Sequence, residues 1–260
     1  MLQIRSLVVV AVVMFASVAH ADDKKYSIAD LKALVGQSAF KEAFQHLGDI
    51  SPAQRNAEWV DVAAAAAGGV LGTLDTEDGT TLALVDEVDR QYPQLLKSAK
   101  YTKPRAEFGL KGLEGCFEQT NGYWSSYGLD NCVKVGLRFV DNSNGDRVLA
   151  LKVAKLARKS MNHYDAVPFF KRALGPKDTA ACKDEDLKLA VVAGLGLPPE
   201  YPKATESKAI MNTCWDDLKD AVLKAFGEDS KGGYVHQNTC DVLLAKKMIS
   251  GLQAKQCEKK

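Results

Sequence analysis

The sequence lacks the residues and motifs that carry most enzyme chemistry. It has four histidines among 260 residues. It contains no G-x-S-x-G nucleophile turn, no H-E-x-x-H zinc helix and no pair of cysteines at the C-x-x-C spacing of thiol oxidoreductases. The cysteine spacing and the scarcity of histidine also argue against a zinc site. We therefore predict no catalytic residue, no metal and no cofactor.

A large net charge is also lacking. The chain has 34 basic and 33 acidic residues, and loss of Arg5 with a cleaved leader would make the two numbers equal. This balance gives no reason to expect nucleic acid as a partner. Lysines near the C-terminus could touch an anionic surface, although such clusters are more often solvated helix faces. They are Lys246, Lys247, Lys255, Lys259 and Lys260.

The N-terminal apolar run lacks the length of a membrane-spanning helix. It covers residues 7–18, well short of the ~20 apolar residues that a spanning helix needs. Arg5 precedes it, small residues surround a predicted cut after Ala21, and charged residues 22–25 follow. This pattern predicts that residues 1–21 are a cleavable secretory signal peptide. The mature chain would then be periplasmic or secreted, with no transmembrane segment.

Cysteine is missing from the first part of the chain and present in even number afterwards. In an exported protein an even number of cysteines favours disulfides. Six cysteines can pair in many ways, and we favour sequential pairing, because polar, glycine-containing residues 119–130 would bring the first two together at facing helix ends. The predicted pairs are Cys116 with Cys132, Cys182 with Cys214, and Cys240 with Cys257.

Residues 147–174 carry the clearest structural pattern. Apolar residues recur at three- and four-residue spacing, stop at residues 160–165, and then resume, which predicts two amphipathic helices folded back on each other. The stripe consists of Ala150, Val153, Ala154, Ala157, Ala166, Phe169, Phe170, Ala173 and Leu174. Pro168 fits this interpretation if Asp165 caps the second helix, because a proline in the first turn sacrifices no hydrogen bond.

The rest of the chain predicts further short helices. Residues 26–37 form one, with Ser27 or Asp30 able to cap its start, and a later helix rich in alanine is expected to break at Gly68 and Gly69. Other predicted helices cover residues 40–47, 82–92, 106–117 and 129–140. Beyond residue 176, apolar helical segments follow Cys182, Cys214 and Cys240, and Thr213 and Thr239 are predicted N-caps. Residues 177–260 are therefore predicted to form a compact helical module stapled by two disulfides.

Two polar connections invite functional interpretation. Tyr123, Trp124 and Tyr127 lie between the first two cysteines, where their rings either form a contact surface or fold back onto the mouth of the hairpin. Residues 141–146 resemble a calcium loop only superficially, because the glycine falls at the fifth place and Lys152 stands at the twelfth. A turn ending in a cap explains them.

The hairpin of residues 147–174 resembles a tetratricopeptide repeat, a unit of ~34 residues in two antiparallel helices. The residues at the family's marker positions are Ala154, Ala157, His163, Ala166, Phe170 and Ala173. Earlier units match through Phe40, Ala43 and Leu47, and through Trp59, Val62 and Ala63. The resemblance covers about residues 26–175. It implies an all-α fold in which residues 22–176 stack as a short α-solenoid before the C-terminal module.

The resemblance implies a binding role, because stacked hairpins present an extended surface to a protein or peptide. If first helices line this surface, the candidate partner-binding residues are Trp59, Lys152, Lys155 and Lys159, together with the aromatic cluster. We therefore predict an exported, non-catalytic protein-binding scaffold of the bacterial cell envelope. The alternatives are an envelope hydrolase with a site assembled from dispersed residues, and a secreted inhibitor or toxin-like factor.

The signal peptide can be tested by expressing the full chain in a bacterial host. We expect the exported protein to begin at Asp22, because small residues flank the preceding bond. Intact mass and N-terminal sequencing of the exported protein measure this directly. A product that retains Met1 and fractionates with membranes would instead identify the apolar run as an anchor.

Overall fold

The computed structural model describes residues 25–74, 80–119, 126–160, 163–175, 179–231 and 235–258. These residues form α-helices and short 3-10 helices, and no strand occurs among them, so the predicted all-helical class is confirmed. The predicted signal peptide lies outside the described residues. The α-helices are α1 (Ile28–Gly36), α2 (Phe40–Gln45), α3 (Ala57–Thr73), α4 (Thr80–Gln91), α5 (Ala99–Gln119), α6 (Ser126–Asp141), α7 (Arg147–Ser160), α8 (Val167–Ala173), α9 (Glu185–Leu195), α10 (Pro202–Thr213), α11 (Trp215–Lys231), α12 (Gln237–Ala245) and α13 (Leu252–Gln256). The 3-10 helices are η1 (Leu47–Asp49), η2 (Pro52–Gln54), η3 (Pro93–Lys97), η4 (His163–Ala166) and η5 (Ala180–Lys183).

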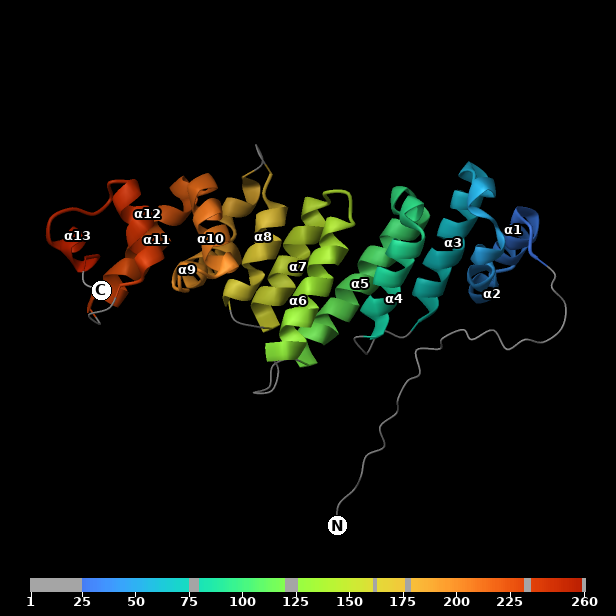
Figure 1. The fold of residues 1–260 in the computed structure, drawn as a ribbon, viewed down its shortest axis with the longest axis horizontal. Helices are drawn as coiled ribbons and strands as arrows, with labels where there is room; N and C mark the ends of the chain where they lie inside the picture. The colour runs from blue at the N-terminus through green and yellow to red at the C-terminus, as the bar shows by residue number, and fades with distance from the viewer. Residues whose placement is uncertain are drawn as a thin grey trace, which may run out of the picture.

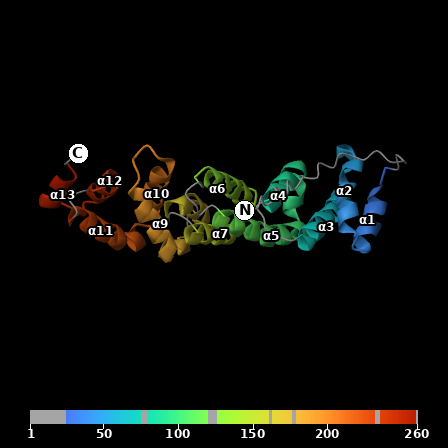
Figure 2. The same cartoon turned by 90° about the horizontal axis from the view of Figure 1, so that it is seen from below.

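The helices follow one another along an elongated molecule, with α1 near one end and α13 at the other (Figure 1). Seen from below, they separate into two rows (Figure 2). The first row contains α1, α3, α5, α7, α9 and α11, and each of these helices contacts the next. In the second row α4, α6, α8, α10 and α12 contact one another in the same way. The chain therefore passes from one row to the other with nearly every helix.

One continuous core joins the two rows. Buried residues from Leu31 in α1 to Ile249 beyond α12 belong to a single hydrophobic cluster. The cluster includes residues of both α8 and α9, which pack against each other. The core is therefore continuous across the boundary at residue 176 that the sequence predicts. Each helix therefore depends on near neighbours in the chain for the burial of its apolar face.

Residues 147–174 form the predicted hairpin of α7 and α8. Ala150, Val153, Ala154 and Ala157 of the predicted stripe are buried on α7, as are Phe169, Phe170 and Ala173 on α8. The small alanines of this stripe and its three-to-four spacing let the two helices pack closely. The hairpin is thus predictable from residue periodicity alone.

The start of α8 corrects one prediction and confirms another. Pro168 occupies the first turn, where its missing N–H removes no intrahelical bond. The predicted cap at Asp165 is wrong, because the N-cap residue is Ala166 and no side chain caps the helix. Asp165 lies in η4, buried, and its carboxylate pairs with the Lys203 ammonium of α10. Asp165 therefore pairs with a residue far along the chain instead of capping the adjacent helix.

Two other predicted caps are present. Ser27 is the N-cap of α1 and forms a capping box with Asp30, in which each side chain binds the other residue's backbone N–H. Asp146 accepts a hydrogen bond of 2.9 Å from the backbone N–H of Leu149 at the start of α7. The polar residues 141–146 therefore include the capping turn that the sequence predicts.

The predicted break at Gly68 and Gly69 is wrong, because α3 continues through both residues. The two glycines permit close helix contacts. A Cβ on Gly68 would lie 2.2 Å from the carbonyl oxygen of Lys100, and a Cβ on Gly69 would lie 2.2 Å from the Phe40 ring. The α5 helix also starts earlier than predicted and contains Pro104, which has no N–H to donate to that Lys100 carbonyl.

Sequential disulfide pairing is confirmed. The Cα atoms are 5.9 Å apart for Cys116 with Cys132, 5.3 Å for Cys182 with Cys214, and 5.7 Å for Cys240 with Cys257. The first bridge joins α5 to α6, the second joins η5 to the junction of α10 and α11, and the third ties the segment after α13 to α12. Such bridges stabilise mainly by restricting the unfolded chain.

The helix limits after residue 180 differ from the predicted ones. The sequence did not predict α10, which ends at Thr213, and the Thr213 hydroxyl donates to the Ala209 carbonyl instead of starting the next helix. Thr239 is buried inside α12, whose N-cap is His236. The repeated Asn-Thr-Cys tripeptide therefore occupies two different structural positions. A hydroxyl inside a helix can bind the carbonyl four residues back as readily as it caps.

Separate substitutions of Gly68, which contacts α5, and Gly72, which does not, test the close contact between α3 and α5. We expect Gly68→Ala to lower the free energy of unfolding by about 2 kcal/mol, because the methyl group would meet a backbone carbonyl that cannot rotate away. Gly72→Ala is the matched control, since nothing lies within 4 Å of its Cβ position, and it should stabilise α3 by about 0.5–1 kcal/mol. Urea unfolding measures both variants, and equal effects would contradict the close contact.

Candidate partner-binding surface

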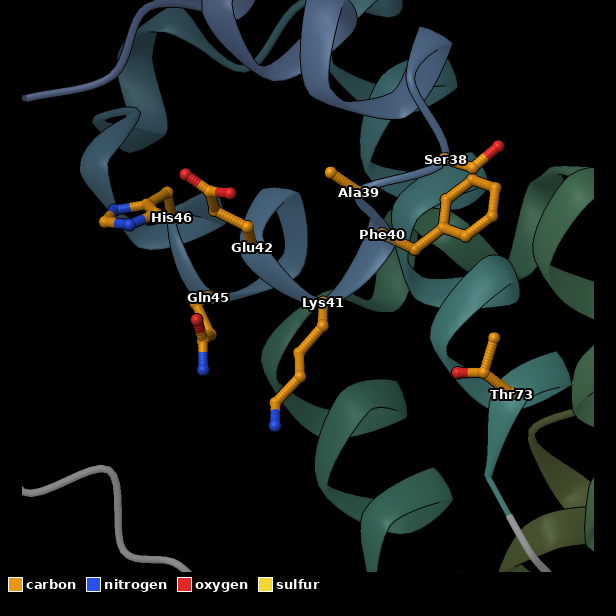
Figure 3. A pocket seen from close by; sticks show the side chains of 8 residues that line it. All are labelled: Ser38, Ala39, Phe40, Lys41, Glu42, Gln45, His46 and Thr73. Carbon is orange, nitrogen blue, oxygen red and sulfur yellow. The ribbon is translucent and has the colours of Figure 1, made fainter.

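A hollow of 610 Å³ opens at the N-terminal end of the molecule, between α2 and the end of α3 (Figure 3). The chain turns into α2 through Ser38, whose φ of 60° lies in the left-handed region. In Figure 3 the Lys41 and Gln45 side chains extend from the same side of α2. The lining residues are Ser38, Ala39, Phe40, Lys41, Glu42, Gln45, His46 and Thr73.

The sequence-based predictions missed this hollow. Its walls come from α2 and from the end of α3, some thirty residues further along the chain. No local periodicity or motif indicates such a meeting of separate elements. The one local signal would have been the break after Gln37, where the chain must turn sharply.

Polar side chains beside the hollow are held by each other. The Asp49 carboxylate accepts a hydrogen bond of 3.2 Å from the backbone N–H of Tyr26 and lies 3.0 Å from Nδ1 of His46. The rings of Tyr26 and His46 stack with centroids 3.9 Å apart. The Tyr26 hydroxyl donates to Glu42, and this hydrogen bond raises the pKa of Tyr26 above its ordinary value. His46 and Glu42 are thereby fixed in the wall of the hollow.

The three predicted lysines lie on α7 and are exposed, but two of them have partners on neighbouring helices. Lys155 Nζ is 2.7 Å from Oδ2 of Asp184, and Lys159 Nζ is 3.7 Å from Oε1 of Glu114. The hydrogen bond to Asp184 raises the pKa of Lys155. Lys152 forms no ion pair with the described residues. Of the three ammonium groups, that of Lys152 is the one uncommitted to a neighbour in this part of the chain.

These lysines belong to a series of ion pairs that cross successive helices of each row. We call it the interhelix ion-pair series. In the first row it links α1 to α3 (Lys32 with Glu58), α3 to α5 (Asp61 with Lys100), α5 to α7 (Glu114 with Lys159) and α7 to α9 (Lys155 with Asp184, Arg158 with Asp186). In the second row it links α4 to α6 (Asp86 with Arg138), α6 to α8 (Asp141 with Arg172), α8 to α10 (Lys171 with Glu206) and α10 to α12 (Lys208 with Asp241).

Of the four aromatic residues predicted to bind a partner, two fall within the described part of the chain. Trp59 is fully buried, which removes its side chain from any accessible surface. It packs beside the Tyr92 ring, and the Arg55 guanidinium lies 4.9 Å from the centroid of its ring. Tyr123 and Trp124 lie outside the described residues, and Tyr127 belongs to the first turn of α6. Trp59 was a candidate because it lies on a predicted first helix, but its ring packs α3 into the core.

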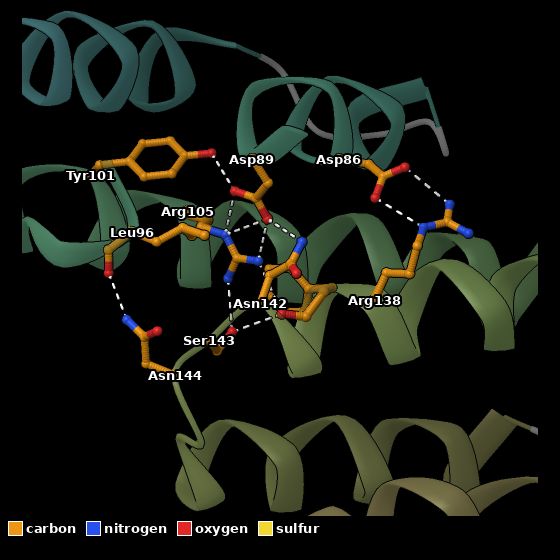
Figure 4. Close-up of polar contacts among 10 residues, drawn as sticks. Asp86, Asp89, Leu96, Tyr101, Arg105, Arg138, Asn142, Ser143 and Asn144 are labelled. Atoms are coloured by element: carbon orange, nitrogen blue, oxygen red, sulfur yellow. Dashed lines mark hydrogen bonds and ion pairs between the residues drawn. The ribbon is translucent and has the colours of Figure 1, made fainter. Parts of the chain in front are cut away.

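A second polar cluster is buried where α4, α5 and α6 meet (Figure 4). Arg105 and Asp89 form an ion pair with side chains 2% and 1% exposed. The Arg105 guanidinium also donates to Oγ of Ser143 at 2.8 Å and to the carbonyl of Phe139 at 2.9 Å. Tyr101 donates to Asp89 at 2.8 Å, and burial, followed by the charge of Asp89, raises the pKa of Tyr101 well above its usual range.

This buried cluster is built for stability. A perturbed titratable group in a cleft can mark a functional site, but the gap beside Asp89 has no room for a water molecule. The guanidinium binds partners from α4, from α6 and from the turn after α6. The cluster therefore fixes three consecutive helices relative to one another.

The described residues contain no group of three or more histidine, cysteine, aspartate or glutamate side chains arranged to hold a metal ion. All six cysteines are in disulfides. Within the same ranges no helix is both long and apolar enough to cross a lipid bilayer.

Comparison with known proteins adds no relative, since the chain matches no protein-family model, no curated protein and no solved structure. The resemblance to tetratricopeptide repeats stays a prediction from the residues.

The buried and exposed ion pairs of α4 provide a matched comparison. We expect Asp89→Ala to lower the free energy of unfolding by roughly 3–5 kcal/mol, because it leaves the Arg105 charge buried without its counterion. Asp86→Ala, which breaks the exposed pair with Arg138 on the same helix, should cost about 1 kcal/mol or less. Chemical denaturation followed by circular dichroism measures both, and a small loss for Asp89→Ala would show that the cluster is not a main stabiliser.

Proposed function

We propose that this protein is an exported, non-catalytic scaffold of the bacterial cell envelope that binds a protein or peptide partner. Three disulfides fit an oxidising extracellular environment. The predicted signal peptide agrees with this location. Residues 1–21 would direct export, and the mature chain would act in the periplasm or outside the cell.

The observation that carries the proposal is the arrangement of the helices in two rows (Figure 2). We interpret these rows as a short α-solenoid of tetratricopeptide-like hairpins in residues 22–176, extended by the disulfide-stapled module of residues 177–260. Stacked hairpins bury their apolar faces against their neighbours and leave an extended, mostly polar surface. Binding a partner along that surface is the activity that such an arrangement supports best.

We place the main partner contact in the N-terminal hollow. Lys41 and Gln45 are exposed there and form no hydrogen bond or ion pair with other described residues. Phe40, half-buried in the same wall, packs its apolar ring against Gly69 of α3. Protein interfaces combine an apolar centre with a polar, solvent-accessible rim, and we assign Lys41 and Gln45 to the rim. On α7 the interhelix ion-pair series already uses Lys155 and Lys159, so that face contributes mainly through Lys152.

The experiment starts with capture from envelope extracts by the immobilised mature protein. A captured protein is identified by mass spectrometry, purified, and titrated against the scaffold by calorimetry. We expect the double substitution Lys41→Glu with Gln45→Ala to weaken the affinity by roughly tenfold or more. Lys152→Glu should weaken it less, because that side chain lies outside the hollow.

The matched control is Lys224→Glu on α11, another exposed lysine that is remote from the hollow. It should leave the affinity unchanged. Equal affinity for all variants would reject the hollow as the contact surface. Binding that survives thermal unfolding of the scaffold would reject a structured binding surface altogether.

A further inference from the structure

The last described segment is a loop closed by the disulfide between Cys240 and Cys257. We call it the C-terminal loop. It contains most of α12, a turn, and the short helix α13, and it lies at the end of the molecule opposite α1 (Figure 1). It therefore has a neighbouring helix on one side only.

The C-terminal loop exposes an unusual share of apolar side chain. The described residues include seven exposed large hydrophobic residues, and three of them fall within this loop. They are Leu244 at 43% exposure, Met248 at 39% and Leu252 at 82%. Leu243 and Ile249 of the same loop are buried and anchor it to the core. The exposed side chains are thus not the result of a detached segment.

The charge of the loop is mostly positive, because its one carboxylate, Asp241, pairs with Lys208 of α10. Between Asp241 and Glu258 every charged residue is a lysine, in a chain whose total charge is close to zero. The three are Lys246, Lys247 and Lys255. None of them forms an ion pair with the described residues, whereas many lysines of the two rows do. Lys246 Nζ instead lies 5.2 Å from the centroid of the Trp215 ring.

Backbone hydrogen bonds fix the conformation of the C-terminal loop. At the end of α12, Lys247 takes a φ of 56°, the backbone N–H of Met248 donates to the Leu243 carbonyl, and that of Lys247 donates to the Leu244 carbonyl. This is the Schellman ending of a helix. Gly251, also at a φ of 56°, begins α13. With the disulfide behind it, the loop presents its apolar and basic side chains without further folding.

We propose that the C-terminal loop docks the protein on an anionic phospholipid surface. Apolar side chains would enter the boundary of the acyl chains, while lysine ammonium groups would meet the headgroup phosphates. Lysine suits this role because its long apolar stem can lie in the interface with its charge at the headgroups. The occupant is a lipid surface rather than a protein, since protein interfaces are enriched in arginine and aromatic residues and depleted in lysine.

The test uses the full mature protein with its disulfides intact and measures co-sedimentation with vesicles. One set is phosphatidylcholine with about one quarter phosphatidylglycerol, and the other is phosphatidylcholine alone. We expect binding to the anionic vesicles that weakens roughly tenfold or more on the neutral ones. Raising the salt concentration should weaken anionic binding in the same direction, because screening shortens the reach of the lysine charges.

Two variants separate the contributions of charge and apolar contact. The triple substitution Lys246→Glu, Lys247→Glu and Lys255→Glu should abolish the preference for anionic vesicles, and Leu252→Asp should reduce binding roughly tenfold. Leu252 is largely exposed, so its substitution should leave the thermal unfolding curve unchanged. The matched control is Leu189→Asp on α9, an exposed leucine outside the loop, which should bind vesicles like the wild type.

Several results would overturn the proposal: absence of wild-type binding, equal binding to neutral and anionic vesicles, or full binding by the triple variant. Capture of an acidic protein through this loop, with no vesicle binding, would also overturn it and identify a protein interface. The outcome is separate from that of the proposed scaffold function, because the hollow lies at the other end of the molecule and its variants keep the loop intact.

Discussion

The fold depends on one constraint, which is that each helix can bury its apolar face only against helices close to it in the chain. A short amphipathic helix is marginal in water by itself, and packing supplies most of its stability. Here that packing comes from the next helix along the chain and from the next helix in the same row. The result is a long molecule with one continuous core rather than a sphere around a central core.

Polar interactions then fix the positions of helices whose apolar faces are already paired. The interhelix ion-pair series lies mostly at the surface, where each pair contributes about 0–1 kcal/mol. The main effect of these pairs is on the register of adjacent helices. The opposite charges lie next to each other at only one offset of the two helices along their axes. The buried pair of Arg105 and Asp89 works differently. Removal of either partner would strand a charge in the core, so α4, α5 and α6 are held together as a unit.

The proposed functions use side chains that take no part in these interactions. Many lysines on the helix rows already pair with carboxylates, and we assign function to unpaired groups at the two ends of the molecule. At the N-terminal end Lys41 and Gln45 stand at a hollow. At the other end the C-terminal loop carries three lysines together with exposed Leu244, Met248 and Leu252. The two ends suit a scaffold that would hold a partner at one end and a lipid surface at the other.

Much of the fold was predictable from sequence, but the candidate site was not. Periodicity identified the α7 and α8 hairpin. Residue type identified the first-turn position of Pro168, the cap at Ser27 and a capped turn in residues 141–146, because these features depend on residues within about one helical turn. Sequential disulfide pairing was a preference, argued from a short connection only for Cys116 with Cys132. The helical hairpin, the caps and this first bridge join residues that are near one another along the chain, whereas Cys182 and Cys214 are 32 residues apart.

The tertiary structure decided the rest. Gly68 and Gly69 were predicted to end α3, yet they lie inside it because α5 and Phe40 approach too closely for a side chain. Trp59 was predicted to face a partner but is buried. Asp165 was predicted to cap α8 but pairs with Lys203 instead. The hollow at α2 and α3 had no local pattern at all. Sequence alone determined most of the segments that form helices and their apolar faces, since turn-length spacing fixes both, but it did not predict α10. Which of those faces and polar groups remain accessible was decided by partners tens of residues away, and residue spacing holds no information about them.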